Sequence, residues 1–105
     1  MIELSQHAWS EGITYTDAVI LDVRTPEEVA QGIIPRAVHC NIYDGARFID
    51  FLETLDRTKH YYVYCRVGAR SGQACRVMDT MGFNHTYNLT GGIMNWQGPV
   101  DQPKT

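Results

Sequence analysis

Short apolar runs recur along the chain and indicate about five strands. Residues 18–23 are apolar except for Asp22, which is typical of a strand buried on both faces near the centre of a parallel sheet. Residues 61–64 form a second buried run, which leads directly to Cys65. Weaker runs predict three further short strands, over residues 2–4 at a sheet edge and over 37–42 and 86–89.

Two brief helices are expected in the first third of the chain. Ser5 is a suitable cap for a helix that ends at Gly12. A second helix begins at Pro26 with Thr25 as its cap, because proline suits the first helical position and acidic side chains follow it. Gly32 is expected to stop this helix.

Two longer helices show an apolar face. Asp44 is the expected cap of the first, in which apolar side chains recur at the three- and four-residue spacing of a buried face. The second covers residues 70–81 and ends at Gly82. The apolar positions of the first are Phe48, Ile49, Leu52 and Leu55, and those of the second are Ala74, Val77, Met78 and Met81.

Strands that alternate with helices imply an α/β fold, with a largely parallel central sheet of about five strands and helices on both faces. Residues 93–96 are expected to form a final helical turn. The 105 residues suit one domain, which we place at residues 1–98, followed by a polar tail over residues 99–105.

Composition narrows the possible functions. Nine basic and twelve acidic residues give a net charge of −3, so no nucleic-acid partner is expected. The N-terminus lacks the features of a signal peptide and no apolar run approaches membrane-spanning length, so we expect a cytoplasmic protein without a membrane partner. Four scattered histidines show no ligand spacing, so neither a metal nor another cofactor is expected, and the oligomeric state stays open.

The chemistry of the chain is expected at Cys65, where a strand gives way to a loop and then to a helix. A thiolate there is surrounded by backbone N–H groups and the positive end of the helix dipole. Gly68 lets the loop turn sharply, Ser71 is expected to cap the helix, and Arg66 and Arg70 add positive charge. Such surroundings lower a cysteine pKa to roughly 3.5–7.5, so Cys65 is expected to be a nucleophile.

The remaining cysteines and several aromatic residues are expected in the core. A free cysteine is most often a small buried hydrophobe, which we expect of Cys40 and Cys75 and which is the alternative interpretation of Cys65. The Arg-x-Gly-x-Arg pattern after Cys65 favours the reactive thiol. The aromatic side chains expected in the core are Tyr61, Tyr62, Tyr64 and Trp96.

Three separated motifs occur in the chain. They are the loop Cys65-Arg66-Val67-Gly68-Ala69-Arg70-Ser71, the stretch Asp22-Val23-Arg24-Thr25-Pro26-Glu27-Glu28, and Thr90-Gly91-Gly92 followed by Trp96. The loop is similar to the Cys-Arg-x-Gly-x-Arg active-site loop of the rhodanese-like sulfurtransferases, and the other two resemble that family's N- and C-terminal signatures. The resemblance covers residues 18–96. In place of the family's Gly-His-Ile-Pro-Gly-Ala, residues 32–37 are Gly-Ile-Ile-Pro-Arg-Ala. The chain therefore lacks the histidine and the second glycine, on which a local hydrogen bond and a tight turn of the family are expected to depend.

The resemblance implies a persulfide mechanism, in which Cys65 takes a sulfane sulfur from a donor and passes it to a thiophilic acceptor. The implied donor is a small anion such as thiosulfate, or a protein persulfide, bound by Arg66 and Arg70. The implied acceptor is a thiol or a cyanide-like group. Asp22 and Arg24 are expected to form a structural ion pair, and Gly91-Gly92 is either a close backbone approach beneath the loop or only a turn.

Three other functions stay open. A cysteine phosphatase or arsenate reductase spaces its residues as Cys-x5-Arg, whereas Cys65 and Arg70 are separated by four residues. A non-catalytic binding or regulatory module would transfer nothing and would need no cysteine. A redox sensor would pair Cys65 with Cys40 or Cys75. Cys75, however, lies about 6 Å further along the helix than Ser71, which is beyond comfortable disulfide reach of Cys65 unless the loop rearranges.

Overall fold

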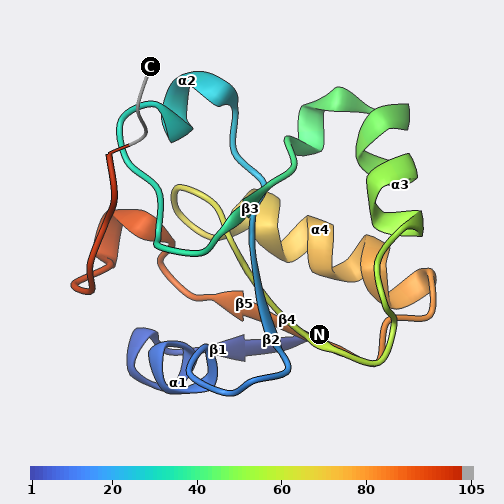
Figure 1. Ribbon diagram of the computed structural model, residues 1–105, viewed down its shortest axis with the longest axis horizontal. Coiled ribbons are helices and arrows are strands. Elements are labelled where there is room, and N and C mark those ends of the chain that lie inside the picture. The colour runs from blue at the N-terminus through green and yellow to red at the C-terminus, as the bar shows by residue number, and fades with distance from the viewer. Residues whose placement is uncertain (103–105) are drawn as a thin grey trace.

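Five strands form one sheet in the order β1-β5-β4-β2-β3, and all neighbouring strands are parallel (Figure 1). The predicted α/β fold with a parallel central sheet is confirmed, and β1 lies at the predicted edge. The computed structural model describes residues 1–102, so the last three residues of the predicted tail lie outside the described part. The strands are β1 (Ile2–Leu4), β2 (Ala18–Asp22), β3 (Val38–His39), β4 (His60–Tyr64) and β5 (His85–Leu89).

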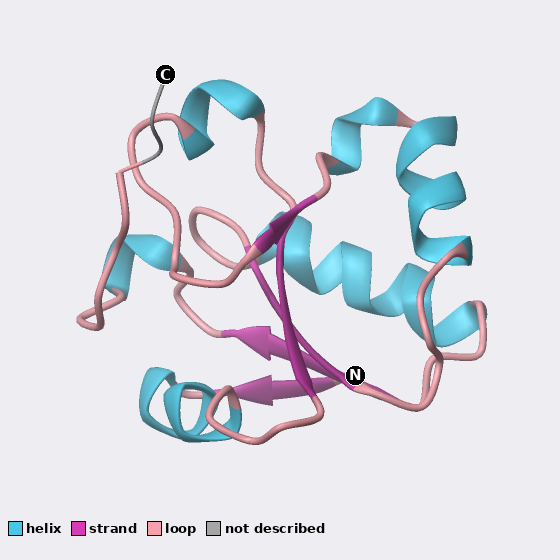
Figure 2. Cartoon of the chain, in the orientation of Figure 1, coloured by secondary structure: helices cyan, strands magenta, loops and turns pink. Residues whose placement is uncertain are grey.

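Helices cover both faces of the sheet, as predicted (Figure 2). One face packs against α1 (Gln6–Gly12), and the other packs against α3 (Ala46–Glu53) and α4 (Ala69–Thr80). The short α2 (Pro26–Val29) follows the carboxyl end of β2. Two 3-10 helices cover Ile42–Asp44 and Ile93–Asn95, the second at the predicted final turn. Within residues 1–102, every helix is too short or too polar to cross a membrane.

The core consists of two apolar clusters, one on each face of the sheet, because side chains alternate along a strand. In β4, Tyr61 and Val63 point to the α3/α4 side, whereas Tyr62 and Tyr64 point to the α1 side. On the α1 side, the buried ring of Trp9 meets three other aromatic rings edge-on, those of Tyr62, Tyr64 and Trp96. The predicted core position is confirmed for Tyr61, Tyr62 and Tyr64, whereas Trp96 is only partly buried against the α1-side cluster.

The prediction for residues 37–46 is wrong in two places. The strand predicted over 37–42 covers only Val38–His39, because Ile42 already begins a 3-10 helix. The side chain of Asn41 caps that helix by accepting a hydrogen bond from the backbone N–H of Tyr43 at 3.0 Å. Asp44 lies inside the 3-10 helix and does not cap α3, which instead begins after Gly45 at a φ of 57°.

The segment that departs from the expected Gly-His-Ile-Pro-Gly-Ala pattern still forms a turn. Arg36 adopts a φ of 70°, a backbone conformation that favours glycine, and the N–H of Ala37 donates to the carbonyl of Ile34 at 3.1 Å. The Arg36 guanidinium holds this turn to the end of α1 by donating to the carbonyl of Ile13 at 2.8 Å. The turn therefore forms with arginine in the glycine position.

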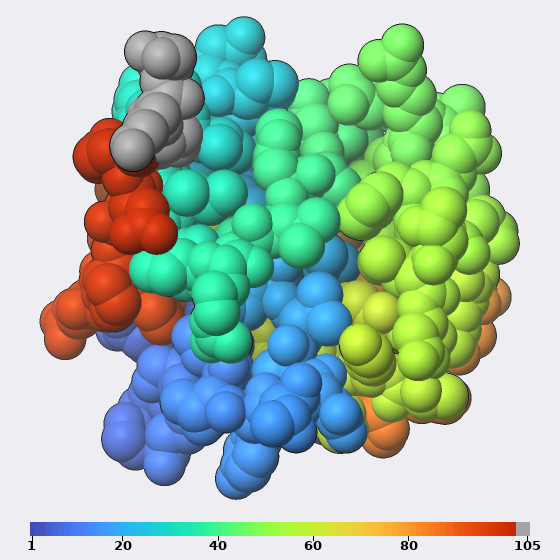
Figure 3. All heavy atoms as spheres, in the orientation of Figure 1, coloured from blue at the N-terminus to red at the C-terminus, as the bar shows by residue number. Residues whose placement is uncertain are grey.

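The C-terminal segment lies against the part of the chain that precedes this turn. Ile33 and Asp101 form an isolated antiparallel bridge, with N–H to carbonyl distances of 2.9 and 2.8 Å. In Figure 3 the red C-terminal segment lies beside the blue-green segment of residues 30–37. The described part of the predicted tail, residues 99–102, is therefore in contact with the domain.

Candidate active site

Cys65 directly follows β4 at the carboxyl edge of the sheet, where parallel α/β sheets place their ligand sites. The loop after it turns at Gly68, whose φ of 108° is in the left-handed region, and α4 starts at the next residue. The Cys65 side chain is a free thiol, and its exposed fraction is 0%. The thiol thus lies between strand and helix, as the sequence predicted.

Hydrogen-bond donors surround the thiol. The backbone N–H of Gly68 lies 3.1 Å from the Cys65 sulfur, and the hydroxyl of Ser71 lies 3.2 Å from it. Burial alone raises the pKa of the Cys65 thiol, but hydrogen bonds from the Ser71 hydroxyl and from loop N–H groups outweigh burial. The pKa therefore lies below its ordinary value. The N–H groups are those of Ser71, Gly68 and Val67.

Ser71 has a different place from the one expected of a helix cap. Gly68 takes the cap position of α4, without a side-chain hydrogen bond, so Ser71 lies within the first turn of the helix. Its buried hydroxyl instead lies within hydrogen-bond distance of the Cys65 sulfur and of the side-chain oxygen of Asn88 on β5. The cap prediction for Ser71 is wrong, and its hydroxyl belongs to the thiol site.

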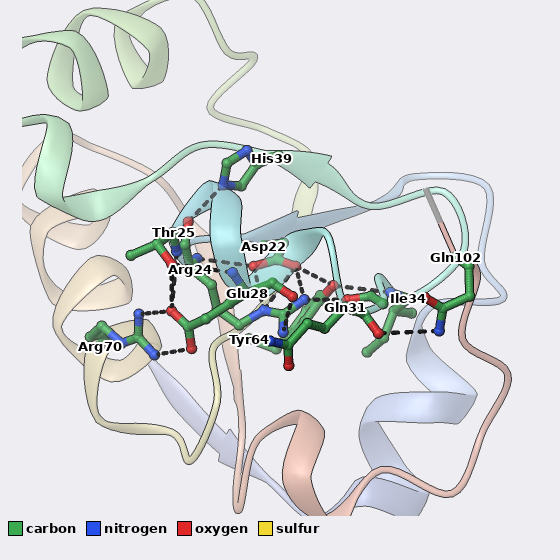
Figure 4. Close-up of polar contacts among 11 residues, drawn as sticks. Asp22, Arg24, Thr25, Glu28, Gln31, Ile34, His39, Tyr64, Arg70 and Gln102 are labelled. Carbon is green, nitrogen blue, oxygen red and sulfur yellow. Dashed lines mark hydrogen bonds and ion pairs between the residues drawn. The ribbon is translucent and has the colours of Figure 1, made fainter. Parts of the chain in front are cut away.

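Arg70 is held by a carboxylate. Its two terminal nitrogens donate to the two oxygens of Glu28 at 2.7 and 2.8 Å (Figure 4). Glu28 also accepts from Thr25 in a capping box at the start of α2. The hydrogen bond from Arg70, with help from Thr25, lowers the pKa of Glu28 to about 2. The positive charge of Arg70 therefore already has a partner.

The rest of the loop is open to solvent. Arg66 is exposed, and no ion pair within residues 1–102 includes it. Val67 is 52% exposed, and Ala69, the first residue of α4, is also exposed. A cavity of about 300 Å³ beside the loop is lined in part by Arg66 and Met94.

Asp22 and Arg24 form the predicted ion pair, at 2.7 Å and with both side chains buried (Figure 4). The Tyr64 hydroxyl donates to Asp22 at 2.6 Å and accepts from the backbone N–H of Ile34 at 3.0 Å. Arg24 also donates to the carbonyl of Gly32 at 2.7 Å. The pair therefore joins the ends of β2 and β4 to the segment after α2.

Gly92 lies beneath the loop. Its φ is 64°, and a Cβ atom there would overlap the backbone carbonyl of Arg66. The next two N–H groups, of Ile93 and Met94, donate to the carbonyls of Cys65 and Arg66 at 3.0 and 3.1 Å. Of the two alternatives for this glycine pair, the close backbone approach is confirmed at Gly92.

Three residues near the thiol were missed by the sequence analysis. Glu28 was placed only in a helix start, and Asn88 and Glu3 were assigned no role. Asn88 is a buried amide in the last strand and is 2% exposed, and its NH2 group donates to the Glu3 carboxylate. A polar residue within a short buried strand was the one available signal. Within residues 1–102, no group of three or more His, Cys, Asp or Glu side chains could hold a metal ion.

Comparisons with known proteins indicate one family. The family described as "Rhodanese-like domain" matches residues 3–99. The Bacillus subtilis (strain 168) protein named "Putative sulfurtransferase YtwF" is 42% identical over 103 residues, which cover 97% of this chain and 95% of that protein. The Allochromatium vinosum protein named "Sulfurtransferase" is 35% identical over 96 residues, 90% of this chain and 86% of the relative.

A solved structure shows the same fold. The rhodanese-related protein from Thermoplasma volcanium superposes with a TM-score of 0.84 at 27% sequence identity. The match covers 98% of this chain and 100% of that chain.

Proposed function

This chain belongs to the rhodanese-like domain family, and from that premise we propose that it transfers sulfane sulfur through a persulfide on Cys65. The observation that carries the proposal is the ring of N–H and O–H donors around a buried thiol, which lowers the pKa of Cys65. A non-catalytic binding module has no use for a thiol in this state.

The proposed reaction has two steps. The Cys65 thiolate attacks the outer sulfur of the donor, a new S–S bond forms, and the donor's own bond to that sulfur breaks. The leaving group departs with the electron pair, as sulfite from thiosulfate or as a thiolate from a persulfide. A thiol or cyanide-like acceptor then attacks the outer sulfur of Cys65, which leaves as a thiolate again.

The loop supports both charged states of this cycle. The loop N–H groups that stabilise the thiolate also lie where a persulfide's negative charge would be held, at the start of α4. Arg66 is the better candidate for binding an anionic donor, because Arg70 is neutralised by Glu28. The cavity beside Arg66 is the proposed approach for the donor.

The alternatives receive less support. A phosphatase needs its loop arginine for the oxyanion, and Arg70 is bound to Glu28. A disulfide switch needs a second ionisable thiol, and burial raises the pKa of both Cys40 and Cys75 to about 12.

The test is the addition of one sulfur to Cys65. The protein is incubated with a panel of donors (thiosulfate, mercaptopyruvate, glutathione persulfide and a loaded cysteine desulfurase), and peptide mass spectrometry scores a gain of about 32 Da. We expect the gain on Cys65 and not on Cys40 or Cys75. No gain with any donor, together with hydrolysis of an aryl phosphate, would overturn the proposal in favour of a phosphatase.

A further inference from the structure

One hydroxyl proton at the site faces three acceptors. The Ser71 oxygen lies 3.2 Å from the Cys65 sulfur, 3.3 Å from the carbonyl of Gly68, and within hydrogen-bond distance of the Asn88 side-chain oxygen. A serine hydroxyl has one proton to donate. Ser71 can therefore serve only one of these three groups at a time.

The orientation of the Asn88 amide is fixed by its other contacts. Its NH2 group donates to the two carboxylate oxygens of Glu3 at 3.1 and 2.9 Å and to the carbonyl of Gly68 at 3.0 Å. All three partners are acceptors only, so a flipped amide would place its oxygen against them. The amide oxygen of Asn88 is thereby held toward Ser71.

We propose that Asn88 is a positioning residue that acts on Cys65 through the Ser71 proton. When Cys65 is a neutral thiol, its S–H donates to the Ser71 oxygen and the Ser71 proton goes to Asn88. When Cys65 is a thiolate, the Ser71 proton turns to the sulfur and the buried oxygen of Asn88 loses its donor. Because a buried acceptor without a donor is unfavourable, Asn88 opposes the thiolate that Ser71 stabilises.

This competition bears on sulfur loading, a part of the inference that rests on the proposed function. In a persulfide the negative charge is carried mainly by the outer sulfur, so the inner sulfur of Cys65 no longer attracts the Ser71 proton strongly. That proton returns to Asn88. Asn88 therefore stabilises the loaded form relative to the empty thiolate.

The charged and titratable groups around the thiol come from several elements, and the substitutions below leave most of them unchanged. Arg70 on α4 lies close enough for its charge to interact with the thiolate. The thiols of Cys40 and Cys75 stay neutral at ordinary pH because their pKa values are about 12. The others are Arg66 on the loop, Glu28 on α2, Glu3 on β1 and the Asp22–Arg24 pair at the end of β2.

The test is a double-mutant cycle read by the pH dependence of Cys65 alkylation. Iodoacetamide reacts with the thiolate, and peptide mass spectrometry counts modification at Cys65 alone. The midpoint of the pH dependence of the alkylation rate reports the pKa of Cys65. We expect Ser71→Ala to move this midpoint to higher pH and Asn88→Ala to move it to lower pH. Below the midpoint, Asn88→Ala should alkylate roughly threefold to tenfold faster than the unchanged protein. In the Ser71→Ala background, Asn88→Ala should have no effect.

A second substitution separates this effect from simple loosening of the loop. Asn88→Asp also loses the donor to Gly68, but it presents a stronger acceptor to Ser71 and adds a negative charge near the sulfur, so the midpoint should move to higher pH. The part of this shift that remains in the Ser71→Ala background measures the charge, and the part that is lost measures the competition for the Ser71 proton. Opposite directions for Asn88→Ala and Asn88→Asp support the inference. If Asn88→Ala does not fold, the cycle is measured with Asn88→Asp, whose shift should shrink in the Ser71→Ala background.

Two results would overturn the inference. One is a shift to higher pH in Asn88→Ala, as a disordered loop would give. The other is a shift that persists at full size without the Ser71 hydroxyl. Sulfur loading of the unchanged protein from thiosulfate is measured separately. If the protein takes up no sulfur, but Asn88→Ala and Asn88→Asp shift the alkylation midpoint in opposite directions, the proposed function is refuted and the role of Asn88 stands.

Discussion

Cys65, Cys40 and Cys75 all belong to the same apolar cluster, yet the pKa of the Cys65 thiol shifts in the opposite direction from the other two. Burial raises the pKa of the Cys40 and Cys75 thiols to about 12. Burial acts in the same direction on Cys65, but the N–H and O–H donors of the loop bring its pKa below the ordinary value. Donors at the end of a strand, rather than exposure to solvent, lower the pKa of this thiol.

The largest expected difference between the two regions is in sulfur transfer itself. Cys65→Ser should lower the rate of sulfur loading from thiosulfate on the order of a thousandfold or more, because the nucleophile is lost. Cys40→Ala and Cys75→Ala should keep loading within a fewfold of the unchanged protein. Loading is followed by mass spectrometry. If Cys75→Ala keeps its fold but no longer takes up sulfur, the expected difference between Cys65 and Cys75 is contradicted.

A change beneath the loop should make Cys65 more like the other two thiols. Gly92→Ala would place a Cβ atom against the Arg66 carbonyl, so the loop must shift and its donors leave the sulfur. We expect the free energy of unfolding to fall by about 2 to 4 kcal/mol and the alkylation midpoint of Cys65 to rise.

Gly45→Ala is the matched control for this change, because Gly45 has a similar φ of 57° but a Cβ atom added there would meet no other atom within 4 Å. This substitution should lower the free energy of unfolding only by the strain of the positive φ, about 1 to 3 kcal/mol, and should leave the Cys65 midpoint unchanged. Urea unfolding and alkylation measure both variants. Equal effects of the two substitutions on the midpoint would contradict the role given to Gly92.

Alkaline pH should separate the two regions through stability. The neutral thiols of Cys40 and Cys75 stabilise the fold below the ordinary thiol pKa of 9.0, and this contribution is lost as the pH rises toward about 12. The pKa of Cys65 is lowered, so its contribution is present at high pH and is lost as the pH falls. Urea unfolding across this pH range should therefore show that the free energy of unfolding falls less at alkaline pH in Cys40→Ala and Cys75→Ala than in the unchanged protein. Cys65→Ser should not show this smaller fall.

The smallest expected effect concerns the charge next to the thiol. Glu28→Gln keeps the side-chain acceptor of the capping box but removes the negative charge that neutralises Arg70. We expect a loss of about 1 kcal/mol in unfolding free energy and a thiosulfate KM lower by about twofold to threefold. Glu27→Gln, on the exposed side of the same helix, is the control. The same change in KM for both variants would show that Arg70 is not involved.

The central strands β2 and β4 could be predicted from the sequence because each contains a local apolar run. The site could be predicted only where neighbouring residues define it, as at Cys65 and Gly68. Arg70 and Glu28 lie 42 positions apart, and Asn88 and Glu3 lie 85 apart, so only the folded sheet brings them together. No local pattern contains such a pair.

The error at Ser71 has a more local cause. A serine after a glycine-containing loop is a common helix cap, and the sequence alone contains no φ for Gly68. With Gly68 at a φ of 108°, α4 begins earlier than expected and Ser71 falls within its first turn, facing the sulfur. The cap therefore lies at Gly68, three residues before the predicted position, and Ser71 contacts the thiol instead of capping the helix.

The complete burial of the Cys65 side chain has a kinetic consequence. A reagent cannot reach the buried sulfur until the loop opens, so we expect its rate of reaction to be the product of an opening equilibrium and the reactivity of the open thiolate. Reagents of increasing bulk should then react at sharply decreasing rates even when their intrinsic reactivity is equal. The size at which the reaction stops measures the widest opening of the loop, and it sets an upper limit on the size of a reagent that can reach Cys65.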